Sequence, residues 1–309
     1  MRKSERDARG PEDDDKSSPS EELSVATILF DGVAYGMLMF VLACGLAVTL
    51  GLMNFVNLAH GAFAMAGGYV TVTLMDRWGV PFLACLPAAF VVSAALGLVM
   101  ERALYRHMYG RGHLEHVLFS IGLVFIAVAM TDYFMGSSQR NITLPSWLQG
   151  RREVLGVNIG IYRSFLIVVC GALALGLQAG LTYTRFGSRL RAAVDDARVA
   201  RGLGIPVGTV FAATFAVGSG LAGLGGALGV ELLGLDPYFP MKFLIYFLIV
   251  VAVGGTSGIM GPFLAALLLG VADVAGKYYL SSALGGFVIY VVLIVVLVLR
   301  PHGLFARAR

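Results

Sequence analysis

The chain has 309 residues, of which 58% are hydrophobic and 14% are charged. Soluble domains average about 45–50% apolar and about 25% charged residues, so this composition excludes an ordinary soluble protein and indicates a polytopic membrane protein. The formal net charge of +4 is modest. It fits arginines gathered on the cytoplasmic side of a membrane better than a nucleic-acid-binding surface.

Residues 1–22 are polar, mixed in charge and interrupted by two prolines, which predicts a disordered tail. The apolar run 23–52 is far longer than the roughly 7–15-residue core of a signal peptide. It therefore predicts a first membrane helix. Residues 23–305 are expected to form one transmembrane domain, and residues 306–309 a short tail.

Further apolar runs follow along the chain and predict additional membrane helices. They are residues 54–75, 81–100, 114–135, 163–181, 209–233, 243–253, 262–280 and 284–299. The run 243–253 is short for a span, which needs about 20 apolar residues. The predicted fold is therefore an all-α, polytopic transmembrane helical bundle with eight or nine crossings.

Three basic segments predict the orientation of the bundle, because cytoplasmic loops carry an excess of Lys and Arg. They are residues 101–113, 185–201 and 300–309, and an even number of predicted crossings separates each from the next. The loop 136–162, which also contains arginines, then falls outside, against the rule. With nine crossings the N-terminus lies outside the cell, and with eight it lies inside.

Polar residues recur at the start of the second predicted crossing. Asn54, Asn57 and His60 are spaced i, i+3, i+6 and are followed by Gly61. Polar groups in hydrocarbon are costly, so each such group indicates either a site or a structural contact. Two interpretations remain open. These residues line a translocation path, or they form hydrogen bonds with neighbouring helices and hold the bundle together.

The segment 182–208 is a charged island between apolar runs. Read at helical period, Leu190, Ala193, Val194 and Ala197 form a narrow apolar stripe, and the arginines stand on the opposite face. Glycine and proline at 204 and 206 supply a stop signal. The pattern predicts a short amphipathic helix at the membrane surface, and the alternative is a solvated basic loop.

Two pairs of charged residues lie near the ends of predicted crossings. Asp273 and Lys277 are four residues apart on one helix and are expected to pair. Glu231 and Asp236 lie at the exit of the run 209–233, where Pro237 is expected to end the helix and leave both carboxylates in water.

The sequence shows no signature of catalysis. It contains no G-x-x-x-x-G-K-[ST] phosphate loop, so the chain is not expected to be an enzyme that hydrolyses ATP by itself. Cys44, Cys85 and Cys170 are far apart within apolar runs and are expected to be small core residues. No catalytic residue, metal site or cofactor is predicted.

Four motifs in order resemble those of one family. They are GLMNFVNLAHGAFAMAGGYV at 51–70, the charged island, VGGTSGIMGPFLAALLLG at 253–270 and RPHGLF at 300–305. Together they resemble the branched-chain amino acid importer permeases of the ATP-binding cassette class, LivH type. The island residues that match the coupling loop of this family are Arg185, Gly187, Arg191, Ala192, Asp196, Ala200, Gly204 and Ile205.

The resemblance implies a type II-like importer permease in the bacterial inner membrane that moves branched-chain or other neutral amino acids by alternating access. It implies four kinds of partner: the lipid bilayer, a second homologous permease subunit, two subunits that bind ATP, and an extracytoplasmic solute-binding protein. The island would then be the coupling helix that contacts the ATP-binding subunits. The alternatives are an ATP-independent channel or secondary carrier for a small neutral solute, and an importer of urea, amides or sugars.

Overall fold

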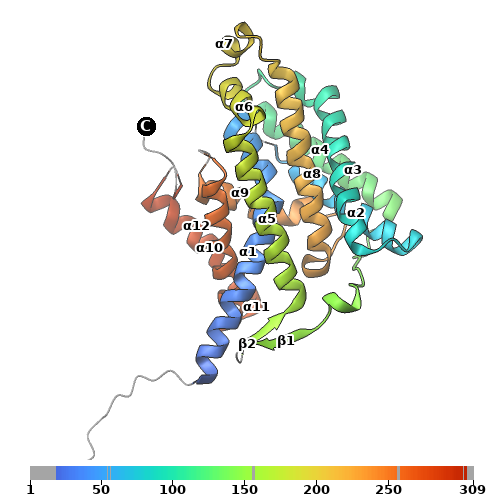
Figure 1. Ribbon diagram of the computed structural model, residues 1–309, viewed down its shortest axis with the longest axis vertical. Helices are drawn as coiled ribbons and strands as arrows, with labels where there is room; N and C mark the ends of the chain where they lie inside the picture. Colours follow the sequence, from blue (N-terminus) through green and yellow to red (C-terminus); the bar gives the residue numbers. More distant parts are fainter. Residues whose placement is uncertain are drawn as a thin grey trace, which may run out of the picture.

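Long helices run roughly parallel to one axis of the molecule, and the chain reverses direction at each end of the bundle (Figure 1). The structure, a computed structural model, describes residues 19–53, 55, 57–154, 157–255, 258–301, 303 and 304. Most of the predicted tail 1–22 and all of the tail 306–309 therefore lie outside the described residues.

The α-helices are α1 (Pro19–Met53), α2 (His60–Trp78), α3 (Phe82–Ala103), α4 (His113–Met135), α5 (Ile161–Tyr183), α6 (Arg185–Asp195), α7 (Ala197–Gly202), α8 (Val207–Leu233), α9 (Phe239–Gly254), α10 (Met260–Tyr279), α11 (Ser282–Gly285) and α12 (Val288–Leu299). Short 3-10 turns, η1 (Tyr105–His107) and η2 (Ser146–Leu148), and two strands, β1 (Arg151–Val154) and β2 (Val157–Gly160), complete the described elements.

Within the described part of the chain, 6 helices are long and apolar enough to cross a membrane. They are α1, α3, α4, α5, α8 and α10. Helices α9 and α12 are apolar but have only 16 and 12 residues, fewer than the roughly 20 that a span needs. The protein is therefore a multi-pass helical membrane protein in which six helices of the described chain meet the length and hydropathy of a span, and the eight or nine crossings stay a prediction.

Helix α8 is the centre of the packing, with α1, α2 and α3 against it. Its glycines let backbones approach: a Cβ at Gly226 would overlap the carbonyl oxygen of Ala64 in α2, and one at Gly223 would overlap Ser93 in α3. Lipid supplies no hydrophobic drive between helices, so such contacts depend on close packing of small residues. The glycine-rich sequence of α8 is therefore the reason that three helices converge on it.

The first two basic segments lie at one end of the bundle, and the described residues of the third contact the end of α9. The Tyr109 ring, after α3, meets the Phe211 ring near the start of α8 at 5.7 Å, which joins the first segment to the region after α7. The backbone N–H of Leu304 donates to the carbonyl of Val253 at the end of α9. The common side that the charge pattern predicts for these segments agrees with this arrangement.

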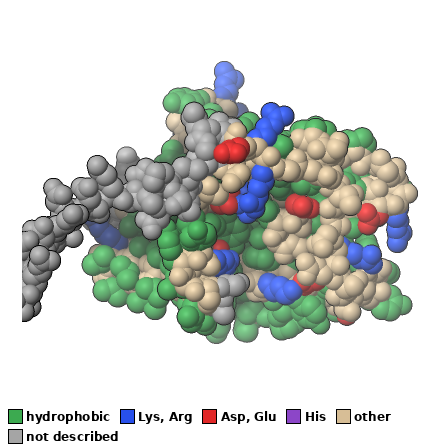
Figure 2. Space-filling view, turned by 90° about the horizontal axis from the view of Figure 1, so that it is seen from below, with side chains coloured by type: hydrophobic (Ala, Val, Ile, Leu, Met, Phe, Trp, Pro, Cys, Tyr) green, Lys and Arg blue, Asp and Glu red, His purple; other side chains and the backbone are tan. Residues whose placement is uncertain are grey.

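The opposite end carries acidic and basic side chains together with much apolar surface (Figure 2). Here β1 and β2 form an antiparallel pair in which Arg151 faces Gly160, a hairpin that the sequence reading did not predict. Valine and isoleucine in this segment favour strands. A further backbone bridge joins Arg140 to Leu235 and fastens the outer loop to the end of α8.

One predicted boundary was wrong, and a second was placed correctly but attributed to the wrong residue. Helix α1 already begins at Pro19, inside the segment expected to be disordered. Helix α8 ends at Leu233 because Gly234 adopts a left-handed backbone with φ of 67°, so glycine and not Pro237 terminates it.

Ionic contacts tie several helices together. Lys277 donates to Asp273 at 2.5 Å, which confirms the predicted pair, and the ammonium also lies 5.6 Å from the centre of the Tyr35 ring in α1. Arg163 of α5 pairs with Asp31 of α1. Asp236 pairs with Lys242.

The predicted core position of the three cysteines is confirmed. Cys44, Cys85 and Cys170 are all buried with free thiols. They contribute to packing between apolar helices, as the sequence indicated.

The packing of α8 leads to a prediction about Gly226. Replacing Gly226 with valine should destabilise the protein by about 1–3 kcal/mol, because the added side chain overlaps the backbone of α2. The measurement is thermal unfolding of the detergent-solubilised protein, followed by size-exclusion fluorescence. Gly176→Val in α5 is the matched control, since nothing lies within 4 Å of a Cβ there. Equal melting temperatures for both variants would contradict the packing role.

Candidate functional site

The polar residues expected on one helical face lie instead in a turn and at the first position of a helix. Helix α2 begins only at His60, and Asn57 precedes it in an irregular segment. The Asn57 side-chain oxygen accepts hydrogen bonds from the backbone N–H of Ala59 at 3.1 Å and from the Tyr105 hydroxyl at 3.0 Å. Asn54 lies outside the described residues. Asn57 thus orders the entry to α2 and ties it to the loop after α3.

His60 occupies the place where three other helices meet. Its Nε2 lies 2.9 Å from the carbonyl oxygen of Leu42 in α1, and its ring lies edge-on to Phe247 of α9 at 6.4 Å. A Cβ at Gly45 would overlap the His60 ring and the carbonyl of Gly218 in α8. The absence of a side chain at Gly45 therefore makes room for the imidazole.

Gly61 has a similar packing environment. A Cβ at this position would lie 2.9 Å from Cα of Pro240 at the start of α9. Asn57 and His60 are 1% and 2% exposed. In this conformation, the described members of the polar set make the contacts expected of residues that hold the bundle together, which is one of the two interpretations of the sequence.

Aromatic rings surround Asn57 and pack the same end of α2. Phe55 lies 5.4 Å from Tyr105 and 4.2 Å from the His116 ring, and Tyr105 lies 4.6 Å from Phe215 of α8. Beside them the Tyr109 hydroxyl donates to buried Glu101 at 3.0 Å. Burial and the Glu101 carboxylate raise the pKa of Tyr109, so that hydroxyl keeps the proton that it donates.

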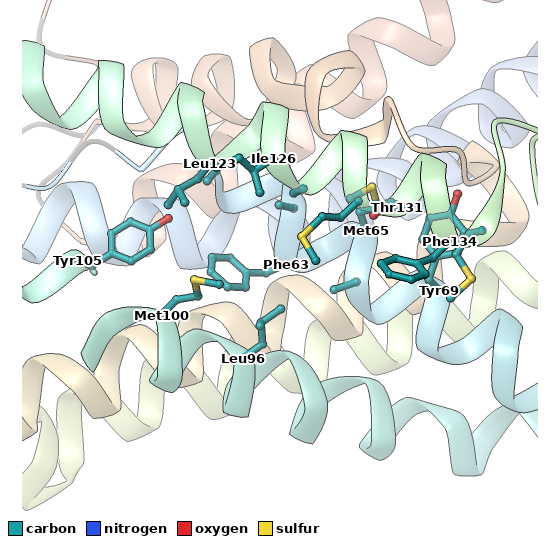
Figure 3. Close-up of a pocket in the computed structure, with 16 residues that line it drawn as sticks. Phe63, Met65, Tyr69, Leu96, Met100, Tyr105, Leu123, Ile126, Thr131 and Phe134 are labelled. Atoms are coloured by element: carbon teal, nitrogen blue, oxygen red, sulfur yellow. The ribbon is translucent and has the colours of Figure 1, made fainter. Parts of the chain in front are cut away.

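A cavity of ≈ 330 Å³ begins at this aromatic group and extends between α2, α3 and α4. Tyr105 lies at one end, and Tyr69 and Phe134 lie at the other (Figure 3). The wall between them is apolar. It is formed by Ala59, Ala62, Phe63, Met65, Ala66, Leu96, Met100, Leu123, Ile126, Ala127, Met130 and Met135, with Thr131 near the Tyr69 end.

This cavity was not predicted from the sequence, although the spacing of small residues along α2 is consistent with it. Ala59, Ala62, Ala66 and Tyr69 follow one another at spacings of three and four residues and form one face of α2. Small residues at such spacing ordinarily indicate close contact with a neighbouring helix. Here α4 makes few contacts with α2, so the same face lines an open space instead.

The charged island forms two short helices and not the single one expected. Asp196 adopts an extended backbone between α6 and α7, and its carboxylate accepts the N–H groups of Arg198 at 2.7 Å and Val199 at 3.0 Å. Aspartate is a favoured N-cap because it satisfies the free N–H groups of a helix start. The second helix therefore begins anew at Ala197.

Two glycines and one alanine of the island fix its position. A Cβ at Gly187 would overlap the carbonyl of Leu181, where α6 turns back against the end of α5. Ala200 packs with Ala193 and with Val207 at the start of α8. Gly204, with φ of 79°, makes the left-handed turn that follows α7. The island is thus joined rigidly to both α5 and α8.

Helices α6 and α7 lie at one end of the helical bundle, and α7 projects beyond it (Figure 1). The two helices and the residues that flank them combine exposed arginines with exposed apolar side chains, which we call the α6–α7 surface. Its members are Tyr183, Arg185, Arg189, Arg191, Arg198, Val199, Arg201 and Leu203. Val199 and Leu203 are 57% and 75% exposed. Arginine and aromatic residues are enriched in protein interfaces, and this surface presents both.

Comparison with known proteins gives consistent matches over nearly the whole chain. The sequence model of the family described as "Branched-chain amino acid transport system / permease component" matches residues 28–297. The chain is 28% identical over 293 residues to the high-affinity branched-chain amino acid transport system permease protein LivH of Escherichia coli, covering 90% of this chain and 94% of the relative. No solved structure matches the chain significantly.

Two further relatives extend the comparison. BraD of Pseudomonas aeruginosa, a permease protein of a high-affinity branched-chain amino acid transport system, is 28% identical over 294 residues, 90% of this chain and 95% of BraD. LivM of Salmonella typhimurium, named as a permease protein of such a system too, is 26% identical over 302 residues, 88% of this chain and 69% of LivM.

The hydrogen bonds of Asn57 lead to a prediction that separates its two interpretations. Replacing Asn57 with leucine should lower stability by about 1–3 kcal/mol, because the Tyr105 hydroxyl and the Ala59 N–H lose their common acceptor in a buried place. Thermal unfolding measures the loss, and Tyr105→Phe, which removes one donor, should cost less. If Asn57→Leu left the melting temperature unchanged and abolished solute uptake, Asn57 would act on a translocation path.

Proposed function

The chain belongs to the family of branched-chain amino acid transport system permease components, and on this premise we propose that it is a membrane subunit of an ATP-binding cassette importer. The importer carries branched-chain or other neutral amino acids across the bacterial inner membrane. The chain itself is a transport subunit and not an enzyme, and ATP is bound by separate partner subunits.

The observation that carries this proposal is the α6–α7 surface. It is the part of the described chain that projects from the end of the bundle, and it presents arginines and apolar side chains together. We propose that it faces the cytoplasm and contacts a groove of an ATP-binding subunit. The predicted coupling residues divide into two groups. Arg185 and Arg191 are exposed, whereas Gly187, Asp196, Ala200 and Gly204 shape the two helices.

Two further partners complete the proposed assembly. Similarity to both LivH and LivM proteins supports a pair of homologous permease subunits. An extracytoplasmic solute-binding protein would deliver the amino acid to the opposite end of the bundle. ATP binding and hydrolysis would shift the pair between outward-open and inward-open states, and the shift requires contacts at the α6–α7 surface that differ between these states.

The importer proposal predicts that uptake depends on ATP. Vesicles are prepared with this chain, its partner permease, the ATPase and the binding protein. They should accumulate radiolabelled leucine only when they contain hydrolysable ATP. The measurement compares ATP with a non-hydrolysable analogue while the membrane potential is held constant. Uptake that continued without ATP hydrolysis would show instead a channel or secondary carrier.

The α6–α7 surface makes a second prediction. The double substitution Val199→Asp and Leu203→Asp should reduce co-purification of the ATPase, and ATP-driven uptake, by about tenfold or more, because burying an unpaired carboxylate in an interface is costly. Affinity purification followed by quantitative blotting measures the first effect.

The matched control is the double substitution Leu280→Asp and Leu284→Asp at the opposite end of the bundle, where the leucines are 60% and 59% exposed. It adds the same charge to comparably exposed apolar positions and should leave ATPase binding unchanged. Full ATPase binding by the Val199 and Leu203 variant would contradict the proposed contact, whereas unchanged uptake in a variant that lost the ATPase would contradict coupling itself.

A further inference from the structure

The cavity between α2, α3 and α4 combines the features of a small-molecule site. Its volume of ≈ 330 Å³ falls at the lower end of the about 300–1,000 Å³ typical for such sites. Its walls are aliphatic and aromatic side chains, and its few polar groups come from Tyr69, Tyr105 and Thr131. An occupant of this space would therefore be largely aliphatic and small.

At the Tyr69 end of the cavity, a buried hydroxyl lacks a hydrogen-bond partner among the described residues. Tyr69 is 6% exposed, and its hydroxyl has no hydrogen-bond partner among the described residues. Native structures rarely leave a buried hydroxyl without a partner, because the lost hydration is not replaced. The Tyr105 hydroxyl at the other end already donates to Asn57. The free polar group of the cavity is thus at one end only.

Charges of both signs lie around that same end. Asp132 directly follows Thr131 of the cavity wall. Asp236 directly follows Leu235, whose side chain lies against Gly68, the neighbour of Tyr69, and whose backbone pairs with that of Arg140. Thr131 supplies a second hydroxyl in the wall. A zwitterion with an aliphatic side chain matches this arrangement, because its ammonium and carboxylate would face the charged end while its side chain entered the apolar part.

From these observations we propose that the cavity binds the aliphatic side chain of the translocated amino acid, with the Tyr69 and Thr131 hydroxyls at its polar end. This inference rests on the proposed function and deepens it, since it places a substrate site within this subunit. Helix α4 forms the outer wall and is lightly packed, with Ile126, Met130 and Phe134 more than half exposed. The wall can therefore open by movement of one helix.

The first test fills the cavity. Ala127→Phe in α4 places a ring in the space and should lower the maximal leucine uptake rate of the assembled importer by tenfold or more. Ala129→Phe is the matched control, because Ala129 lies on the exposed side of the same helix and does not line the cavity. Both variants are first checked for assembly with the ATPase.

The outcomes separate the two proposals. If the unmodified importer transports leucine and Ala127→Phe behaves like Ala129→Phe, the cavity is not a substrate site, while the proposed function stands. If the unmodified importer moves no branched-chain amino acid, the proposed function fails and the substrate site fails with it.

The second test detects occupancy directly. Photo-leucine, a diazirine analogue of leucine, should label peptides of α2 and α4 in the complete importer held in nanodiscs, and excess leucine should prevent the labelling. Tyr69→Phe keeps the shape of the cavity and removes the free hydroxyl. It should raise the photo-leucine concentration for half-maximal labelling about five- to tenfold, the expected effect of one lost hydrogen bond.

A diazirine phospholipid in the same nanodiscs distinguishes an amino acid from a membrane acyl chain. Labelling by the phospholipid that leucine does not displace, together with no labelling by photo-leucine, would overturn the proposal and identify the cavity as a lipid site. Labelling by photo-leucine that Tyr69→Phe leaves unchanged would overturn the role of the hydroxyl.

Discussion

Close approach of backbones at α8 is the constraint on which the rest of this structure depends. In lipid the helices gain nothing by hiding apolar side chains from one another, so association depends on direct packing of small residues. Gly223 and Gly226 of α8 meet α3 and α2 so closely that a single methyl group would overlap the neighbour. A similar approach joins α1 and α10, where Gly36 and Gly270 meet. These crossings define a tightly packed centre of α1, α2, α3, α8 and α10.

The tightly packed centre accounts for two other features of the structure. These are the light packing of α4 and the burial of the polar side chains at the start of α2. Helix α4 makes few contacts with the bundle, and the small-residue face of α2 therefore borders a cavity and not another helix. The polar side chains at the start of α2 are drawn into the centre, where each finds a specific partner: Asn57 with Tyr105, and His60 with the Leu42 carbonyl. In this conformation the described polar side chains thus make packing contacts, while the buried hydroxyl without a partner among the described residues belongs to Tyr69.

Hydropathy and local chemistry predicted the helices because these signals act over short distances. Every long apolar run became a helix, Asp273 found Lys277 one turn away, and the cysteines lie in the core. The failures came where a single capping or turn residue overrides the hydropathy pattern, and where the distance between two helices decides the outcome. Asn57 left the helix because its side chain caps the following turn, Asp196 divided the island by capping α7, and Gly234 ended α8 before Pro237 could. The cavity was not predicted because the spacing of residues along α2 does not determine the distance between α2 and α4.

The geometry joins the two candidate regions through one helix. Ala193 and Ala200 of α6 and α7 pack on Val207, the first residue of α8, so a force on the α6–α7 surface acts directly on α8. Further along, a Cβ at Gly97 of α3 would overlap Ser219 of α8, and Gly97 lies between Leu96 and Met100, both of which line the cavity. Because α8 also holds α2 through Gly226, two of the three cavity walls rest on it. Tight packing transmits a displacement and does not absorb it. If the proposed ATP-binding subunit moved α7, the displacement would therefore reach the cavity through α2 and α3 together. Helix α4, which is lightly packed, would then move relative to them and open or close the cavity.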